Sequence, residues 1–574
     1  MPFRPIVSAL IFALLLAFAP NVRAASPAPV GAEHGMVVSA HHLASDAGVR
    51  VLKQGGNAVD AAIAMAYALA VTFPEAGNLG GGGFMTIRLA DGRETFIDFR
   101  ETAPAAATRT MFLDADGKVV PGRSTRGYLA AGVPGTVAGL ELAREKYGTR
   151  PRAELVRPAI DLAARGFVLD QGDVELLADG AQDFRRDAPS AAIFLKNGAL
   201  FEAGDRLVQK DLAKMLRVIA KDGAAGFYRG EPARLIVAAS QANGGIFTMA
   251  DFAAYTAVER TPVSCEYRGY RIISAPPPSS GGVVLCESLN ILSGWPIDRF
   301  GFHSAQSVHV MTEALRRAFR DRNLNLGDPG FVQADIAKLV SPAYAATLRA
   351  GISLDRATPS SALGGIGAGS EGSSTTHLSV VDAQGSAVSL TYTLNDWFGA
   401  RVTPAGTGIL LNDEMDDFSA KPGAPNMYGL VEGANNAIAP GKRPLSSMTP
   451  TIVTRDGKLA LVVGTPGGSR IPTGVLQVVV NLIDHGMTIT EAVNAPRIHA
   501  QWMPDVLFHE KDALSAETRA ALAAKGHKLE QIGYGNHIAA IIVDGPAFGK
   551  PPRGRARLYG AIDPRLPVGT VDGY

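Results

Sequence analysis

The feature that most constrains the fold is an abrupt change of residue composition at Thr375. Residues 360–374, SSALGGIGAGSEGSS, are rich in glycine and serine, and only Leu363 and Ile366 carry bulky side chains. Such a composition is typical of an exposed stretch that does not pack into a core. The chain then passes at once into THLSVVD and SAVSLTYTL, two strand-like runs separated by a short turn at 383–385. We therefore expect the chain to tolerate a cut at this junction without losing its fold.

On both sides of this junction the chain alternates between helical and strand-like patterns. From Gly35 to Phe84 the sequence predicts a strand, a helix, a second helix capped by Asn57, and a glycine-rich turn where backbone packs on backbone. Residues 125–350 are mainly helical in pattern. Beyond Thr375 we expect helices at GVLQVVVNLIDHG and ITEAVNAPRI, and short strands at GILLND, TPTIVTR, KLALVVGT and HIAAIIVD. Such a mixture favours layered α/β or α+β packing.

The segment 1–24 is predicted to be a signal peptide rather than part of the fold. Arg4 gives a positive start, residues 6–18 are mostly apolar, and residues 22–24 (Val-Arg-Ala) offer a cleavage site. The apolar run is too short to span a bilayer comfortably, and no later segment has about 18 uninterrupted apolar residues. We therefore expect an exported protein, periplasmic or secreted, without stable membrane insertion. An uncleaved anchor is the alternative.

Composition and motifs exclude several classes of function. The 574 residues include 55 basic and 54 acidic side chains without long runs of either sign, which argues against nucleic acid as the main ligand. The histidines are scattered without an HExxH motif, and two cysteines are too few for a Cys-rich zinc site or a disulfide scaffold, so no metal is expected. Cys265 and Cys286 could pair in an oxidising compartment or remain free thiols. A GxSxG nucleophile elbow is also missing from the sequence.

The remaining candidate for chemistry is Thr375 itself. A threonine hydroxyl is a poor nucleophile near neutral pH unless a base lies beside it. Cleavage of the bond between Ser374 and Thr375 would supply that base, because a free α-amino group has a pKa of about 7.7–8.0. The amine would be held within reach of the hydroxyl by covalent geometry. A threonine at the start of a strand is more often structural, so spacing alone leaves this role open.

Several motifs, taken together, resemble those of the gamma-glutamyltranspeptidases. The run TTHLSVVDAQGSAVSLTYTLNDWFG, which begins at Thr375, is similar to the signature of that family. The motifs GNLGGGGFM, DFRETAP, GILLNDEMDDFS, KRPLSSMTPTIV and GTPGGSR also occur in the family's order. The likeness extends from about residue 33 to residue 574 and is strongest to the bacterial exported members.

The resemblance implies a fold and a maturation step. The fold would be α+β, of the N-terminal-nucleophile hydrolase type, a four-layer αββα sandwich made as one precursor. The precursor would cleave itself before Thr375 into a large subunit, residues 25–374, and a small subunit, residues 375–574. The two subunits would stay together as one body. Thr375 would become the nucleophile, and Thr393 would hydrogen-bond to it and orient it.

The resemblance also implies a reaction. Thr375 would attack the γ-carbonyl of glutathione or another γ-glutamyl compound, and the acyl group would pass to water, an amino acid or a peptide. The backbone N–H groups of Gly467 and Gly468 would form the oxyanion hole. No cofactor is implied.

The donor carries a free α-carboxylate and a free α-ammonium, so its pocket needs both signs of charge. By resemblance, Arg100 would clamp the carboxylate with its bidentate fork and Asp417 would hold the ammonium. Glu414, at a position where the family has Gln or Glu, makes the pocket more acidic. The segment 421–429, KPGAPNMYG, is similar to a lid loop, with Tyr428 as the gate. The other implied contacts are Ser446 and Ser447 to the carboxylate and Asn395 to the ammonium.

Two other functions remain as alternatives. A cephalosporin or glutaryl acylase would share the scaffold, but its substrates lack the α-ammonium, so the acidic group at 414–417 favours a γ-glutamyl donor. An exported binding protein that never cleaves itself would leave one intact chain. The presence together of Thr375, Thr393, Gly467 and Gly468 argues against such a binding protein.

Overall fold

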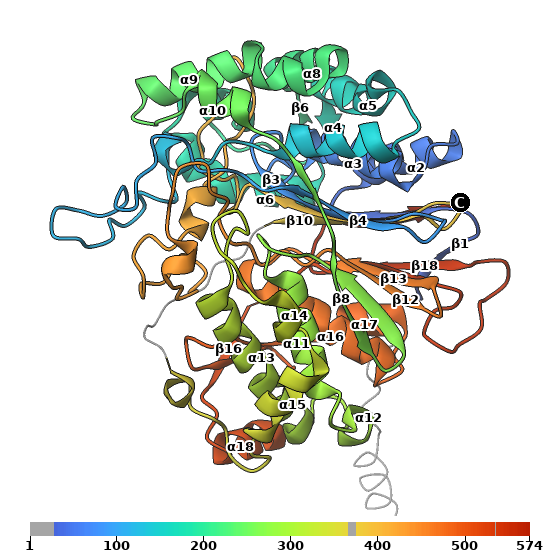
Figure 1. Ribbon diagram of the computed structural model, residues 1–574. Helices are drawn as coiled ribbons and strands as arrows, with labels where there is room; N and C mark the ends of the chain where they lie inside the picture. Colours follow the sequence, from blue (N-terminus) through green and yellow to red (C-terminus); the bar gives the residue numbers. More distant parts are fainter. Residues whose placement is uncertain (1–27, 365–374, 534) are drawn as a thin grey trace, which may run out of the picture.

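Two β-sheets lie face to face between two layers of helices, as Figure 1 shows. The computed structural model describes residues 28–364, 375–533 and 535–574. The predicted signal peptide and most of the Gly/Ser-rich stretch lie outside the described residues. The four layers confirm the predicted α+β sandwich of the αββα type.

The first sheet has seven strands, and every neighbouring pair in it is antiparallel. In spatial order its strands are β19 (Thr570–Gly573), β2 (Met36–Ser39), β10 (Thr376–Val381), β11 (Ala387–Thr393), β3 (Gly82–Arg88), β4 (Glu94–Phe99) and β7 (Val258–Arg260). The two strands predicted after Thr375 are β10 and β11 at its centre, paired so that Leu378 faces Leu390.

The second sheet also has seven antiparallel strands. In spatial order they are β1 (Val30–Ala32), β18 (Leu558–Ile562), β17 (Ala539–Val543), β13 (Lys458–Gly464), β12 (Thr451–Arg455), β9 (Tyr270–Ser274) and β8 (Val263–Tyr267). Both sheets combine strands from before and after residue 374, so a cut at that point would leave two interleaved fragments.

The helices of the upper layer in Figure 1 cover the first sheet. They are α2 (His42–Lys53), α3 (Ala58–Thr72), α4 (Thr136–Tyr147), α5 (Arg152–Arg165), α6 (Gln171–Phe184), α7 (Ala188–Phe194), α8 (Lys210–Tyr228), α9 (Glu231–Ala242) and α10 (Met249–Ala254). The predicted cap of α3 is confirmed, because the Asn57 side chain accepts from Asp60 N while the Asp60 side chain accepts from Asn57 N. Helix α3 is buried on all sides between its neighbours and the sheet.

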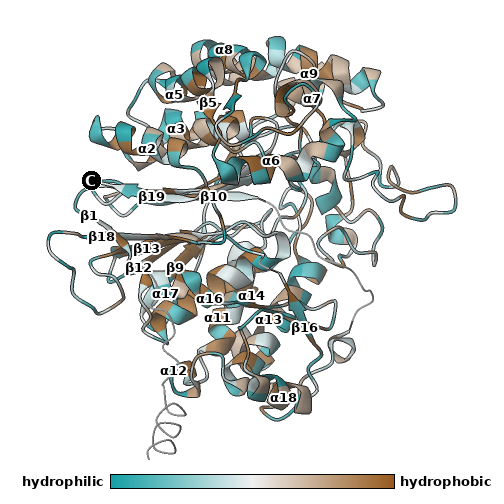
Figure 2. Cartoon of the chain, turned by 180° about the vertical axis from the view of Figure 1, so that it is seen from behind, coloured by the Kyte–Doolittle hydropathy of each residue, from teal (hydrophilic) through white to brown (hydrophobic). Residues whose placement is uncertain are grey.

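The helices of the lower layer cover the second sheet. They are α11 (Gly281–Leu292), α12 (Ile297–Phe300), α13 (Ala305–Asn325), α14 (Ile336–Leu339), α15 (Pro342–Ala350), α16 (Ile471–Ile483), α17 (Ile489–Asn494) and α18 (Ala516–Ala524). Figure 2 shows that helices of the outer layers carry both hydrophilic and hydrophobic residues, as expected where one side packs on a sheet.

Small elements complete the chain. They are β5 (Phe167–Val168), β6 (Arg206–Leu207), β14 (Ile498–Ala500), β15 (Leu507–Glu510), β16 (Leu529–Ile532) and the single turns η1 (Tyr128–Ala130), η2 (Ser360–Leu363), η3 (Glu414–Asp417), η4 (Ala434–Asn436) and η5 (Gly468–Arg470). The helix predicted for ITEAVNAPRI is shorter than expected. Helix α17 ends at Asn494 because Pro496 disfavours helical backbone in the residue before it.

The strand predicted at GILLND is wrong. Residues 408–413 run as irregular chain with one isolated bridge, from Leu411 to Gly80. Their backbone N–H groups find partners in three separate segments: Leu411 N donates to Val402 O, Asn412 N to Gly80 O, and Asp413 N to Leu394 O. A short apolar run indicates burial, but it does not reveal which backbone will satisfy the hydrogen bonds.

Polar side chains join the two sheets. His377 bonds to Thr391 and Ser379, and the Ser379 hydroxyl donates to the Ala539 carbonyl of the opposite sheet. Ser389 likewise donates to Val463 O. Burial lowers the pKa of His377 to about 3, so this histidine is neutral at ordinary pH and serves the packing.

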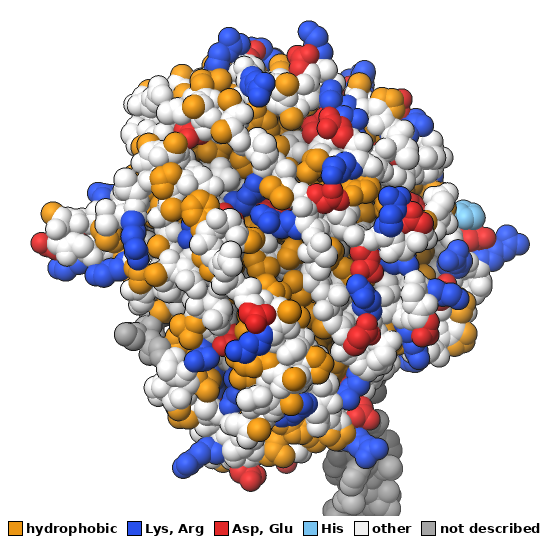
Figure 3. Space-filling view, in the orientation of Figure 1, with side chains coloured by type: hydrophobic (Ala, Val, Ile, Leu, Met, Phe, Trp, Pro, Cys, Tyr) orange, Lys and Arg blue, Asp and Glu red, His pale blue; other side chains and the backbone are white. Residues whose placement is uncertain are grey.

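The two cysteines form a disulfide between β8 and α11, with Cα atoms 5.7 Å apart, which resolves a question that the sequence leaves open. Figure 3 shows basic and acidic side chains interspersed over one face, in line with the near-zero net charge. Within the described residues, no helix is both long and apolar enough to span a membrane.

Candidate active site

The predicted site residues gather at one end of the two sheets. In the first sheet Thr375 directly precedes β10, Thr393 ends β11 and Arg100 follows β4. In the second sheet Ser447 lies shortly before β12, and Gly467 lies shortly after β13. Because neighbouring strands are antiparallel, these starts and ends meet at one edge of the sandwich.

A single pocket at this edge is lined by ten of the eleven predicted residues. They are Arg100, Thr375, Thr393, Asn395, Glu414, Asp417, Tyr428, Ser446, Ser447 and Gly468. The eleventh, Gly467, is the chain neighbour of Gly468. Four more lining residues escaped prediction: Leu430, Met448, Ser469 and Ile471. Each of the four lies within or beside a recognised motif, but apolar and hydroxyl side chains carry no distinctive signal by themselves.

Thr375 is buried and held against the end of β11. Its Oγ1 lies 3.2 Å from Thr393 Oγ1, which also accepts a hydrogen bond of 2.8 Å from Asn395 N. The Thr393 carbonyl in turn accepts from Asn78 Nδ2 at 2.9 Å. Thr393 is therefore fixed through both its backbone and its side chain, and its hydroxyl lies within hydrogen-bond distance of the Thr375 hydroxyl.

The backbone at Thr375 is strained in the uncut chain. Its φ is 134°, a value that a β-branched residue rarely adopts. Such a conformation costs about 1–3 kcal/mol and is found mainly at functional sites. The strain lies at the predicted cleavage point, where breaking the preceding bond would release it.

Gly467 and Gly468 require glycine for steric reasons. Their φ values are 131° and 53°. A Cβ on Gly467 would lie 2.3 Å from the Gly535 carbonyl oxygen, and one on Gly468 would lie 2.4 Å from the ring of Tyr428. Gly467 is the N-cap of η5, which begins at Gly468 and continues directly into α16. The N–H groups at such a helix start favour negative charge nearby.

The opposite end of the pocket is charged. Arg100 is buried and forms ion pairs with Glu414 and Asp417, while its Nε donates to Pro444 O at 3.1 Å. A third carboxylate, Glu101, lies 3.8 Å from Arg100 Nη1. The sequence-based expectation assigned Arg100 and Asp417 to different substrate charges; the structure brings them together as partners of each other.

Burial and charge together shift the pKa values of these groups. Burial alone would lower the pKa of Arg100, but the three surrounding carboxylates outweigh it and raise the pKa. Burial raises the pKa of Glu414 well above its ordinary value, and Arg100 opposes the shift. Burial likewise raises the pKa of Glu101 to about 7, again against the effect of Arg100.

A second layer of contacts holds Arg100 in place. Asp98, fully buried, accepts from Arg100 N at 3.0 Å and from Arg443 Nη1 at 3.1 Å. Arg443 Nη1 also donates to the Arg100 carbonyl at 2.9 Å, and Arg260 Nε donates to Asp98 at 2.7 Å. Arg443 comes from the chain after residue 374, so both predicted fragments contribute to this support.

The predicted lid residue Tyr428 lines the pocket. Its hydroxyl donates to the Asn395 carbonyl at 2.8 Å, and its ring lies against Gly468. The neighbouring Met427 N donates to Asp416 at 3.0 Å. Asp416 also accepts from Ser124 Oγ at 2.6 Å. Met427 and Tyr428 thus hold the C-terminal end of the segment 421–429 against the pocket.

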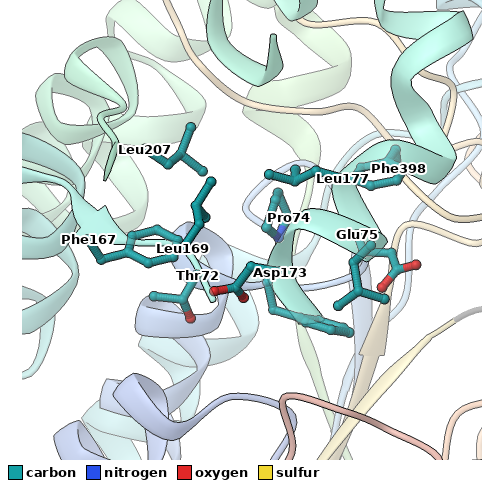
Figure 4. A pocket seen from close by; sticks show the side chains of 11 residues that line it. Thr72, Pro74, Glu75, Phe167, Leu169, Asp173, Leu177, Leu207 and Phe398 are labelled. Atoms are coloured by element: carbon teal, nitrogen blue, oxygen red, sulfur yellow. The ribbon is translucent and has the colours of Figure 1, made fainter. Parts of the chain in front are cut away.

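A different pocket, with other lining residues, is seen from close by in Figure 4. Its lining is mostly apolar and includes Phe167, Leu169, Leu207 and Phe398, together with the carboxyl groups of Asp173 and Glu75. None of the predicted site residues lines it. Among the described residues, no group of three or more His, Cys, Asp or Glu side chains could hold a metal ion.

The fold and the pocket define a class: a four-layer αββα protein with a threonine at the head of a central strand, the N-terminal-nucleophile hydrolase fold. The family model described as gamma-glutamyltranspeptidase matches residues 44–570, and the chain belongs to this family.

Individual relatives agree with this assignment. A glutathione hydrolase proenzyme of Pseudomonas sp. (strain A14) is 59% identical over 555 residues, which cover 96% of each chain. The glutathione hydrolase proenzyme of Escherichia coli (strain K12) is 50% identical over 548 residues, covering 95% of this chain and 93% of the relative. In structure, the cephalosporin acylase from Bacillus halodurans is similar with a TM-score of 0.82 at 27% identity, covering 97% of this chain and 99% of the acylase.

Proposed function

We propose that the chain is a self-processing gamma-glutamyltransferase that cleaves the γ-glutamyl bond of glutathione and related compounds. The observation that carries the proposal is the pocket itself. It places the hydroxyl of Thr375, at the head of a central strand, in one cavity with a buried arginine and two buried carboxylates. A nucleophile beside a binding site for both signs of charge fits a donor that bears an α-carboxylate and an α-ammonium.

Maturation comes first. Thr375 Oγ1 attacks the carbonyl carbon of Ser374; the new C–O bond forms, the C–N bond breaks, and the hydroxyl proton passes to the departing nitrogen. Water then hydrolyses this ester, which leaves a carboxyl group on Ser374 and returns a hydroxyl to Thr375. The freed α-amine becomes the base for later turnovers. The two fragments, residues 25–374 and 375–574, remain together because both sheets contain strands of each.

Turnover repeats this chemistry on the donor. Thr375 Oγ1 attacks the γ-carbonyl, and its proton passes by way of the α-amine to the leaving nitrogen as the C–N bond breaks. Water, or the amine of an amino acid or peptide, then attacks the acyl-enzyme and frees Thr375. Gly467 and Gly468 N–H groups stabilise the tetrahedral oxyanion, and Thr393 holds the nucleophile in position.

The charged end of the pocket selects the donor. The α-carboxylate binds Arg100, helped by Ser446 and Ser447, while the α-ammonium binds Asp417 and Glu414, with Asn395 beside them. A zwitterion inserted between Arg100 and its carboxylates adds no net charge to a buried site, so the exchange of partners avoids a large desolvation penalty. Tyr428 closes the pocket.

The proposal extends to location and to the acylase alternative. The segment 1–24 directs export, and the mature enzyme acts in the periplasm or outside the cell. A cephalosporin or glutaryl acylase needs no partner for an α-ammonium, so the carboxylates of Glu414 and Asp417 beside Arg100 support a γ-glutamyl donor.

Two measurements test the function. Intact mass and N-terminal sequencing should give two fragments, one beginning at Thr375, for the wild type and one uncut chain for Thr375→Ala. The mature enzyme should release p-nitroaniline from γ-glutamyl-p-nitroanilide at least about 100-fold faster than from glutaryl-p-nitroanilide, which lacks only the α-amino group. A reversed preference would favour the acylase, and an uncut, inactive wild type would favour the binding protein.

A further inference from the structure

One hydroxyl in the pocket has no part in the proposed mechanism. Ser469 follows Gly468 and lines the same pocket as Thr375. Its side chain is only 1% exposed, and within the described part of the chain its Oγ has no hydrogen-bond partner. A buried hydroxyl without a partner costs about 1–3 kcal/mol, and a hydrogen bond gained during the reaction would offset that cost.

The position of Ser469 indicates what the hydroxyl is for. Ser447 Oγ is also buried without a described partner, but it lies in the segment next to Pro444, whose carbonyl contacts Arg100. Ser469 instead lies in η5, at the turn formed by Gly467 and Gly468. Its hydroxyl therefore belongs to the end of the pocket where the carbonyl is attacked, not to the end where the charges are bound.

We propose that Ser469 is a further catalytic residue, whose hydroxyl donates a hydrogen bond to the oxyanion formed on the acyl group at Thr375. The inference rests on the proposed function. Two backbone N–H groups and one hydroxyl then converge on the developing charge. Because the Ser469 hydroxyl has no other described partner, it gives up no hydrogen bond to the protein when the oxyanion forms. Its new hydrogen bond is therefore gained mainly in the transition state.

The same donor serves both chemical steps. Self-cleavage at Ser374 and donor cleavage each pass through a tetrahedral oxyanion at Thr375. Loss of the hydroxyl should therefore slow maturation as well as turnover. A residue that only binds the donor would affect turnover alone.

The chain offers matched controls for the test. Ser288, in α11, is also fully buried with an unpartnered hydroxyl, yet it does not line the pocket. Replacing Ser288 by alanine removes the same atom from a comparable environment away from the chemistry. Ser469→Thr keeps a hydroxyl at the proposed position and tests for rescue.

The experiment compares wild type, Ser469→Ala, Ser469→Thr and Ser288→Ala, with rates expressed per cleaved chain so that slow maturation does not mask turnover. Ser469→Ala should lower kcat for γ-glutamyl-p-nitroanilide about 100-fold and leave KM within about threefold, and Ser469→Thr should restore much of the loss. Ser288→Ala should match the wild type in both constants.

Three outcomes would overturn the proposal: an unchanged kcat in Ser469→Ala, a change confined to KM, or an equal loss in Ser288→Ala. If Ser469→Ala fails to mature, the rate of precursor cleavage in Ser469→Thr decides, since a return of cleavage supports the donor role and its absence contradicts it. An inactive wild type would contradict the proposed function instead, so the two failures are distinguishable.

Discussion

The two ends of the pocket are built by different means. At the catalytic end, uncharged groups are fixed by sheet ladders and a helix start: Thr375 and Thr393 by β10 and β11, Gly468 by η5. At the binding end, Arg100 and its carboxylate partners come from segments outside the strands and are held by one another. Under the proposed function, the catalytic end is ready for reaction, whereas the binding end would exchange ionic partners when a donor enters.

This contrast separates two functions that share one nucleophile. Self-cleavage attacks the chain's own peptide bond and needs only the catalytic end, whereas turnover needs both ends. Variants of the binding end should therefore mature normally and turn over poorly. Variants of the catalytic end should be slow in both steps.

The largest effect is expected at Arg100. Arg100→Lys keeps the positive charge but loses the planar fork that reaches Glu414, Asp417 and Pro444 O together. We expect kcat/KM for γ-glutamyl-p-nitroanilide to fall on the order of 10³-fold, mainly through KM, because a buried charge with unmatched partners costs about 3–5 kcal/mol. Gel electrophoresis should show complete cleavage into two fragments. A chain that stays uncut would break the distinction between the two ends.

The converse test is Thr393→Ala. Loss of its hydroxyl removes the contact with Thr375 Oγ1 and the acceptor for Asn395 N. We expect the rate of self-cleavage and kcat each to fall about 100-fold, with KM little changed, since a misplaced nucleophile affects every step that it performs. Thr393→Ser should recover most of both rates. If maturation stays fast while kcat falls, Thr393 does not act on the nucleophile in both steps.

A smaller effect is expected at Asp98, which accepts a hydrogen bond from Arg100 N. Asp98→Asn weakens the acceptor that holds Arg100 N and Arg443, so the guanidinium of Arg100 should lose its fixed position. We expect about a tenfold rise in KM, with kcat nearly unchanged and normal maturation. Arg260→Gln is the control, because Arg260 donates to Asp98 and not to Arg100 among the contacts of the described residues. An equal rise in KM for both variants would reduce Asp98 to a purely structural role.

The predictions from the sequence agree best with the structure for features that are set by residues adjacent in the chain. The strands that follow Thr375 and the cap at Asn57 were predictable, because they depend on residues adjacent in the chain. The disulfide between Cys265 and Cys286 was not predictable, since it depends on how β8 and α11 come together in space.

The same reasoning explains the failures within the site. Residues 408–413 show a strand-like pattern, yet their backbone hydrogen bonds go to three separate segments, which the pattern of these six residues does not record. The ion pairs of Arg100 join residues more than 300 positions apart, so the sequence could suggest the individual charges but not their mutual neutralisation. Ser469 was missed because a lone serine carries no signal until its burial and its missing partner are known.

A pH test sharpens the comparison further. Burial raises the pKa of Glu414, and Arg100, Glu101, Asp417 and Asp413 are the charged groups that act on it. Below its raised pKa the carboxyl is neutral and attracts the donor's ammonium less strongly, so KM should rise as pH falls. In Glu414→Gln this inflection should disappear, leaving a KM roughly tenfold above that of the wild type at pH 8. Measuring log KM between pH 5 and 9 for both enzymes tests this. A parallel pair of curves would mean that another group controls binding.

The smallest effect is expected at the lid, which lies across both ends. Tyr428→Phe removes only the hydrogen bond from the hydroxyl to the Asn395 carbonyl and keeps the ring against Gly468. A neutral hydrogen bond contributes about 0.5–1.5 kcal/mol, so KM should rise by about two- to tenfold while kcat and maturation stay close to the wild type. Tyr428→Ala, which also removes the ring, should have the larger effect, and stopped-flow measurement of donor binding should show faster dissociation in both variants. Equal kinetics in Tyr428→Phe and the wild type would assign the lid's contribution to the ring alone, because the ring is the part that both share.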